Sequence, residues 1–430
     1  MASLYALGFI TGAITTPITG PLIDRFGRKR SAILYCALEM GINLLEQYPF
    51  LSGLLVSRMV GGITTNLLSS VFETWLDTEF RNRRRAPKCG VDTATIIDDD
   101  TTYTFETSNE DDVAKNEYEL IMRDSVIVSN LASIASGYLA HVLAEKYGST
   151  GPFQGAVSCT GIALIVISVL WTENYGVSST TTYGEEEEMP SNDTDSHDEG
   201  GTKSVMDYMK QAIATFRSDP KILCLGIIQG LSTGSLQIFI FLWSPTLQIF
   251  CSANSNIGTG ASDSDDNISL KSFFGWAMDG MGNPAYGLIF GAFMAAGVSG
   301  GLCSPYVRGA VGLLFPNSEG TSALQTIYLE TDRNSVRPQE LEFLVGMNYI
   351  FAAVLMLVPL FLSSSSPESF SIALVAFLMY EFLVGVTMPC EGVIRSLYLP
   401  SDGRATMMMV PRLVVNLAVS LGVLLTRYIS

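Results

Sequence analysis

Residues 20–30 have the sequence GPLIDRFGRKR and join two long apolar runs near the start of the chain. Gly20 allows two helices to approach closely, and Gly27 allows a turn with positive φ. Asp24 can face the N-terminus of a helix, and Arg28 is one of the cations that hold a membrane boundary. This stretch therefore predicts a tight charged turn between two membrane-spanning helices.

Apolar runs long enough to cross a bilayer recur along the chain. Of its 430 residues 48% are apolar and only 16% are charged, whereas about a quarter of a soluble domain is charged. In hydrocarbon only helices or closed barrels satisfy the backbone, and the runs are too long for barrel strands. We therefore expect an all-α integral membrane protein with ten spans, at residues 2–22, 32–48, 51–75, 124–146, 152–171, 222–249, 284–304, 343–363, 368–389 and 407–428.

The charges fall mainly in the connections between these runs. There are 25 Lys and Arg against 42 Asp and Glu, a balance that excludes a nucleic-acid binder, while the apolar content excludes a disordered chain. Most of the cations lie on one side, and the connections on the other side hold only Lys146, Lys271 and Arg427. The positive-inside rule then places the turn at residues 20–30 in the cytoplasm.

One acidic segment divides the ten runs evenly. We expect an N-terminal helical bundle of five spans at residues 1–171, an acidic mobile cytoplasmic linker at 172–221 and a C-terminal bundle of five spans at 222–430. The linker contains runs too acidic to bury apolar surface. Such a division is typical of transporters built from parallel repeats.

Residue types that carry enzyme chemistry are sparse. The chain has seven cysteines without a C-x-x-C pair, only two histidines, and no H-E-x-x-H or G-x-S-x-G motif. No metal site, cofactor or catalytic constellation is indicated. We therefore do not expect an enzyme.

The turn at residues 20–30 resembles the signature G-x-x-x-D-R-x-G-R-R/K-R/K of the major facilitator superfamily, which joins its second and third helices. The resemblance implies a two-bundle fold of twelve helices, of which this chain holds ten, apparently the second to the eleventh. A truncated gene model is the expected reason, with a true ten-span variant as the alternative.

Several further stretches are similar to the eukaryotic molybdate-anion transporter family of this superfamily. They are RMVGGITT at 58–65, FETW at 72–75, ENY at 173–175, FLWSP at 241–245 and Arg412. The family's acidic residue shortly after Gln229 is absent. The resemblance implies secondary uptake of molybdate by alternating access through the plasma membrane, although an internal membrane would give the same hydropathy.

Arg58 is the first candidate for binding an anionic substrate. An arginine within a span is costly and normally faces a bundle interior or an aqueous cavity. Helical periodicity places Arg58 on one stripe with Thr65 and Glu73, and a guanidinium can donate two parallel hydrogen bonds to a tetrahedral dianion. The alternative is an internal salt bridge to an acid on another helix.

Other polar residues within the spans join this candidate site. Arg412 precedes Asn416 on nearly the same helix face, with a side chain that snorkels to the headgroups as the alternative. Gln229 and Thr233 recur at helical spacing and could donate to a dianion, and interhelical hydrogen bonds explain them equally well.

Carboxylates are the candidates for coupling and gating. A dianion entering a negative cell works against about 2.3 kcal/mol per charge per 100 mV, so uptake needs a coupled ion such as the proton. Glu73 and Glu381 are flanked by apolar residues and could titrate. Asp24 and Arg28 belong to the charged turn, and the alternative role of Glu73 is an inward-face latch that binds Arg28 together with Asp77 or Glu79.

Two other classes of function fit the same sequence. One is a major facilitator carrier of another small solute, such as a sugar or an organic anion, because a fold does not set the substrate. The other is a membrane receptor or scaffold that does not transport.

Overall fold

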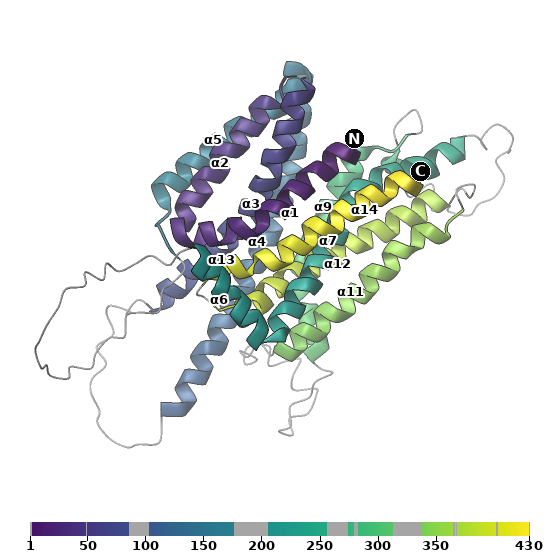
Figure 1. Ribbon diagram of the computed structural model, residues 1–430. Helices are drawn as coiled ribbons and strands as arrows, with labels where there is room; N and C mark the ends of the chain where they lie inside the picture. The colour runs from purple at the N-terminus through teal and green to yellow at the C-terminus, as the bar shows by residue number, and fades with distance from the viewer. Residues whose placement is uncertain are drawn as a thin grey trace, which may run out of the picture. The chain divides into compact units, whose positions relative to one another are not determined.

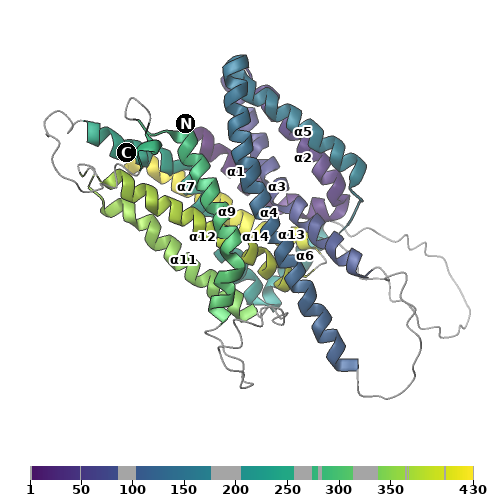
Figure 2. The same cartoon turned by 180° about the vertical axis from the view of Figure 1, so that it is seen from behind.

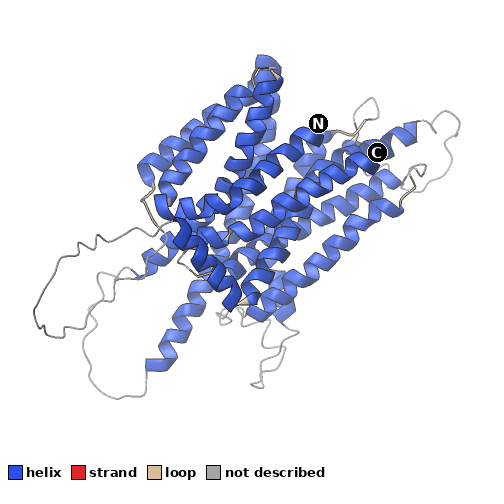
Figure 3. Cartoon of the chain, in the orientation of Figure 1, coloured by secondary structure: helices blue, strands red, loops and turns tan. Residues whose placement is uncertain are grey.

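In a computed structural model of the chain, the described residues form helices with turns and loops between them and no β-strand, as Figure 3 shows. The described residues are 2–48, 50–85, 103–175, 205–255, 274–278, 283–312, 338–363, 366, 368–400 and 403–429. The all-α prediction is confirmed. Intrahelical hydrogen bonds satisfy the backbone without help from water, as spanning a bilayer requires.

A long helix forms at each of the ten predicted runs (Figure 1). These helices are α1 (Ala2–Phe26), α2 (Arg28–Leu45), α3 (Leu51–Arg85), α4 (Tyr103–Tyr147), α5 (Gly151–Leu170), α7 (Pro220–Ser255), α9 (Tyr286–Gly312), α11 (Pro338–Phe361), α12 (Ser369–Tyr398) and α14 (Met409–Ile429). Four short pieces accompany them: η1 (Gly148–Thr150), α6 (Val205–Ser218), η2 (Gly275–Ala277) and α13 (Arg404–Met407).

Within the described ranges, 9 of these helices are long and apolar enough to cross a membrane. The tenth, α2, begins with Arg28, Lys29 and Arg30 and carries Glu39 in its middle, which lowers its mean hydropathy. Apolar side chains cover outward faces as well, for example on α5, where Ile165 is 65% exposed. A helix with such a face is suited to lipid, and the chain is a multi-pass membrane protein.

The described helices fall into two compact units, which do not follow chain order. Unit 1 comprises Met1–Pro87, Tyr147–Ile238 and Leu399–Ser430, and unit 2 comprises Lys88–Lys146 and Phe239–Tyr398. The division into sequential bundles at 1–171 and 222–430 stays a prediction.

In unit 1, α1 packs against α3 and α14, and α2 packs between α3 and α5. Figures 1 and 2 both show α2 and α5 side by side. Small residues bring α1 and α3 together, because a Cβ on Gly62 would lie 2.6 Å from the backbone nitrogen of Gly12. An apolar core that includes Ile23, Leu67 and Val71 lies between these helices.

In unit 2, α9 packs closely along α12, and α11 covers another side of α12. Gly300 on α9 faces the backbone carbonyl of Phe382, and Gly385 on α12 faces that of Gly297, so a side chain at either glycine would collide with backbone. Only glycine fits at these positions, because no room is left for a side chain. Such contacts let membrane helices pack closely in lipid, where the hydrophobic effect does not favour the association of helices.

The predicted linker at residues 172–221 contains one element that the sequence analysis did not expect. Residues 205–218 form α6, which buries Tyr208 and Ala212 and packs against α1 and α13. This part of the linker can bury surface because its apolar residues recur at helical spacing. The acidic runs between residues 176 and 204 lie outside the described residues.

Candidate functional site

The turn after α1 has the conformation that its sequence predicts. Gly27 has a φ of 95°, a region that residues with a Cβ rarely adopt, and a Cβ there would collide with the carboxylate of Glu173. That carboxylate accepts hydrogen bonds from the backbone N–H groups of Lys29 at 2.9 Å and Arg30 at 3.2 Å. Glu173 therefore caps the N-terminus of α2, where Gly27 has no side chain to do so.

Asp24 faces the start of α13, as predicted. Its carboxylate accepts hydrogen bonds from the backbone N–H of Thr406 at 2.9 Å, the hydroxyl of Thr406 at 2.8 Å and the backbone N–H of Ala405 at 3.4 Å. Gly20, one turn earlier, permits the approach, because a Cβ there would lie 2.7 Å from the Cα of Thr406. Close packing and hydrogen bonds to a carboxylate thus hold α1 against α13.

A group of buried charges surrounds this contact. Arg28 pairs with Asp24 at 3.7 Å and donates to the hydroxyl of Thr78, and Arg404 pairs with Asp77. The four charged side chains are at most 1% exposed. We call Asp24, Arg28, Asp77 and Arg404 the turn cluster. It lies on the side that the charge distribution predicts to be cytoplasmic.

The role of Glu73 as a latch stays a prediction. The ion pair of Arg28 is with Asp24, which lies four residues earlier across the same turn. Asp77 binds Arg404 and Arg81. Glu73 is half-buried one turn before Asp77 on α3.

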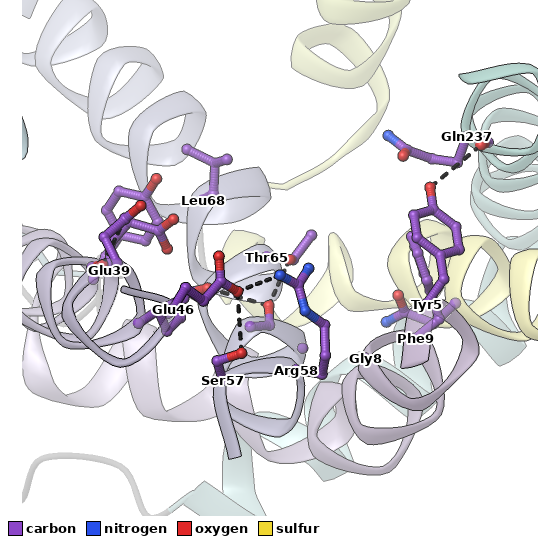
Figure 4. Close-up of a pocket in the computed structure, with 17 residues that line it drawn as sticks. Tyr5, Gly8, Phe9, Glu39, Glu46, Ser57, Arg58, Thr65, Leu68 and Gln237 are labelled. Carbon is purple, nitrogen blue, oxygen red and sulfur yellow. Dashed lines mark hydrogen bonds and ion pairs between the residues drawn. The ribbon is translucent and has the colours of Figure 1, made fainter. Parts of the chain in front are cut away.

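The other end of α1 lines a cavity of about 330 Å³ in unit 1. This volume is at the small end of the range for small-molecule sites, about 300 to 1,000 Å³. Its walls come from α1, α2 and α3, with one side chain each from α7 and α14. We call this space, shown in Figure 4, the polar cavity. Its charged and polar lining residues are Tyr5, Tyr35, Glu39, Asn43, Glu46, Ser57, Arg58, Thr64, Thr65, Gln237 and Asn416.

Arg58 lines the polar cavity and pairs with Glu46. The Glu46 carboxylate accepts from the Arg58 guanidinium and from the Ser57 hydroxyl, the latter at 3.0 Å, as Figure 4 shows. The Arg58 side chain is 42% exposed and that of Glu46 is 11% exposed. Arg58 is therefore in an internal salt bridge and also borders a cavity, and its role in binding a substrate stays a prediction.

Asn416 connects the polar cavity to the contact between α1 and α3. Its amide donates to the hydroxyl of Thr16 and to the side-chain oxygen of Asn66, both at 3.1 Å, and Asn66 donates to the carbonyl of Gly12 at 2.9 Å. Thr65 also lines the cavity and donates to its own helix at Gly61. These hydrogen bonds hold the side chains of Thr65 and Asn416 in fixed orientations in the wall of the cavity.

Arg412 lies on α14 one turn before Asn416, outside the lining of the polar cavity. Its side chain is only 9% exposed, and its Nε is buried without a hydrogen-bond partner among the described residues. No carboxylate in the described ranges pairs with it. This burial does not fit a side chain that snorkels to the headgroups.

The remaining candidates are not gathered at the polar cavity. Gln229 is buried on α7 and Thr233 is half-buried one turn later, and it is Gln237 on the same stripe that reaches the cavity. There the backbone carbonyl of Gln237 accepts a 3.4 Å hydrogen bond from Tyr5. Glu381 lies in unit 2 on α12, 6% exposed, with no hydrogen bond or ion pair to another described residue.

The sequence analysis did not assign a role to Glu39 or Glu46, although both line the polar cavity. A signal for Glu46 was present. The last turn of α2 and the first turns of α3 flank a short connection, so residues 46 and 58 lie close when the two helices pair as a hairpin. Opposite charges at such positions predict an ion pair.

Comparison with known proteins shows to which family the chain belongs. A family model described as "Sugar-transporters, 12 TM" matches residues 1–97 and 106–261, more than half of the chain. A molybdate-anion transporter of Xenopus tropicalis is 23% identical, with 99% of this chain and 70% of that protein covered. One of Takifugu rubripes is 22% identical, with 99% and 71% covered.

A solved structure shares the fold. The structure of the proton:xylose symporter XylE, bound to 6-bromo-6-deoxy-D-glucose, has a TM-score of 0.51 and 11% sequence identity, covering 100% of this chain and 78% of the symporter. At this identity the likeness concerns the arrangement of helices alone.

Proposed function

Because the chain belongs to the major facilitator superfamily, in the family of twelve-span sugar transporters, we propose that it carries molybdate or a similar tetrahedral oxyanion across the membrane. The chain is a membrane transporter of the major facilitator type. The choice of substrate rests on the names of its relatives and on the chemistry of the polar cavity.

The observation that carries the proposal is the position of Arg58. Its guanidinium borders a cavity otherwise rich in neutral donors such as Thr65 and Asn416. A planar guanidinium can donate two parallel bonds to two oxygens of a tetrahedral dianion. The hydroxyl of Thr65 and the amide of Asn416 donate within the protein, so they reach the remaining oxygens only by exchanging those partners.

Arg412 supports the same proposal from outside the cavity lining. A guanidinium that is nine-tenths buried without a carboxylate partner is costly, and its positive potential favours an anion nearby. We assign it the role of attracting the substrate along α14 after the anion has left Arg58. Gln229 and Thr233 stay candidates for neutral donors on this path.

We propose alternating access as the mechanism. The turn cluster closes the cytoplasmic end of unit 1 by tying α1 to α13 and α3 to α13, whereas the polar cavity lies at the other end of α1. Release to the cytoplasm requires these contacts to open. Glu381, buried without a described partner, is the candidate for a coupled proton in unit 2, and Glu73 is a further candidate. We place the protein in the plasma membrane.

A sugar is the second candidate substrate. The family model is described by sugar transport, and neutral hydroxyl and amide groups outnumber the charged ones in the cavity lining. Such groups suit the hydroxyls of a neutral solute. A sugar does not require Arg58, so the two candidates separate on the response to its removal.

Uptake in cells tests the proposal. Cells that express the chain should accumulate molybdenum from dilute molybdate, and Arg58→Ala and Arg412→Ala should each lower this accumulation at equal surface expression. Arg83→Ala is the matched control, since Arg83 forms an exposed ion pair with Glu79 at the far end of α3. Molybdate uptake that is unchanged in both Arg58→Ala and Arg412→Ala would contradict the proposal. Uptake of xylose in place of molybdate would favour the sugar. Transport of neither solute would favour a receptor or scaffold.

A further inference from the structure

The polar cavity has a charge balance that opposes an anion. Glu39 and Glu46 line it together with Arg58, so two carboxylates face one guanidinium. Figure 4 shows Glu46 turned toward Arg58 while Glu39 lies farther along α2. A dianion that entered this space unchanged would meet repulsion from both carboxylates.

The guanidinium is already occupied. Glu46 holds Arg58 in an ion pair and is itself anchored by the Ser57 hydroxyl. Glu46 contacts the guanidinium through Nη2 alone, and a tetrahedral dianion that takes two parallel N–H bonds, one of them from Nη2, must displace it. An arriving oxyanion therefore competes with Glu46 for Arg58.

The ion pair has the properties of an exchangeable contact. Arg58 is 42% exposed, and half-exposed ion pairs are weak because water screens them. Glu46 follows the last residue of α2, where the chain leaves the helix, so its side chain can rotate away from Arg58 without breaking helical packing. The Ser57 hydroxyl can bond to its own helix at Leu54, at 2.9 Å, when Glu46 leaves.

We propose that Glu46 acts as an internal substitute for the substrate. Its carboxylate pairs with Arg58 while the cavity is empty, and the incoming oxyanion displaces it. This inference rests on the proposed function, since it takes the substrate to be an anion. The inference makes Glu46 a residue that determines the affinity for the substrate, because its negative charge competes with the substrate for Arg58.

Displacement leaves Glu46 and Glu39 beside the bound dianion, and their repulsion lowers the affinity for it. The other ionisable groups that face Glu46 are Arg58 on α3, Tyr35 on α2 and Tyr5 on α1. The residues that α7 and α14 place in the described lining, Gln237 and Asn416, are neutral. Arg58 is therefore the only cation in the described lining, and Glu46 competes with the substrate for it.

Equilibrium binding of molybdate to the purified chain in lipid nanodiscs tests the inference. Glu46→Gln removes the competing charge but keeps the size of the side chain. It should bind molybdate about fivefold more tightly than the wild type, the most that a half-exposed ion pair withholds.

Two variants serve as controls. Glu39→Gln removes a carboxylate from the same cavity without freeing Arg58, so its gain in affinity should be smaller. Glu145→Gln removes an exposed carboxylate in unit 2, outside the polar cavity, and should leave affinity unchanged. Elution as a single species and an unchanged melting temperature establish that each variant is folded.

The outcomes separate the inference from the proposed function. Weaker or unchanged binding by Glu46→Gln, with wild-type binding intact, contradicts the inference alone and identifies Glu46 as a structural support for Arg58. Absence of molybdate binding by the wild type at every pH contradicts the proposed function, and the inference falls with it. A second measurement needs no molybdate: Arg58 should react faster with phenylglyoxal in Glu46→Gln than in the wild type.

Discussion

The turn cluster and the polar cavity both pair arginine with carboxylates, yet they differ in exposure. In the turn cluster, Asp77 and Arg404 are each 1% exposed, whereas in the cavity Arg58 is 42% exposed. Removing one partner of a buried pair leaves an uncompensated charge, while a half-exposed pair is solvated when it opens. The first arrangement suits a closed contact between helices, and the second suits exchange with a solute.

The largest expected effect comes from breaking the buried pair. Asp77→Asn leaves Arg404 uncompensated and should lower the free energy of unfolding by about 3–5 kcal/mol. Thermal unfolding of the purified protein in detergent measures this. The double variant Asp77→Asn with Arg404→Met should recover most of the loss, because the charge of Arg404 is then removed together with that of Asp77. An Asp77→Asn protein as stable as the wild type would show that the cluster is not closed by this pair.

The turn itself should be nearly as sensitive. Gly27→Ala forces a Cβ into positive φ and against the Glu173 carboxylate, at an expected loss of about 1–3 kcal/mol of stability. Gly41→Ala on α2 is the matched control, since a Cβ there meets nothing within 4 Å. Equal melting temperatures for the two variants would rule out a strained turn at Gly27.

Replacing Arg412 should raise the stability of the protein while lowering its transport activity. Arg412→Met removes a buried cation without a described carboxylate partner, so the variant should be more stable by about 1 kcal/mol. Uptake of molybdate should fall about tenfold, the effect of losing a charge-assisted hydrogen bond. Melting temperature and initial uptake rate are measured on the same preparation. A variant that loses stability along with uptake would mark Arg412 as structural.

The smallest change in stability is expected when the ion pair between Glu46 and Arg58 in the polar cavity is broken. Glu46→Gln should change the free energy of unfolding by no more than about 1 kcal/mol, because Arg58 becomes solvated when released. Compared with Asp77→Asn, the same type of substitution then gives a several-fold smaller loss in the unfolding experiment. A loss as large as that of Asp77→Asn would remove the distinction between the two regions.

Much of the fold could be predicted because the bilayer leaves few choices. Each of the ten apolar runs forms a helix, and the GPLIDRFGRKR turn depends on local features, namely a glycine with positive φ and an aspartate near a helix start. Helix ends were less predictable. α3 and α4 extend well beyond their apolar runs, since polar residues continue a helix without any hydropathy signal.

The site was predictable only in part. Arg58, Thr65 and Asn416 were found because polar residues within a span are conspicuous, and all three line the polar cavity. The Asp77–Arg404 pair joins residues 327 positions apart, so nothing local indicates it. The partner of Arg58 was missed because Glu46 lies at a helix end, where an acidic residue needs no special explanation.

Direct binding of radiolabelled molybdate to the purified chain, compared between the wild type and Arg58→Ala, tests the central claim. We predict that the wild type binds, that unlabelled tungstate or sulfate displaces the label while xylose does not, and that Arg58→Ala binds at least about tenfold more weakly. Equal binding by the two proteins, or displacement by xylose, would contradict the assignment of Arg58 as the cation that receives an oxyanion.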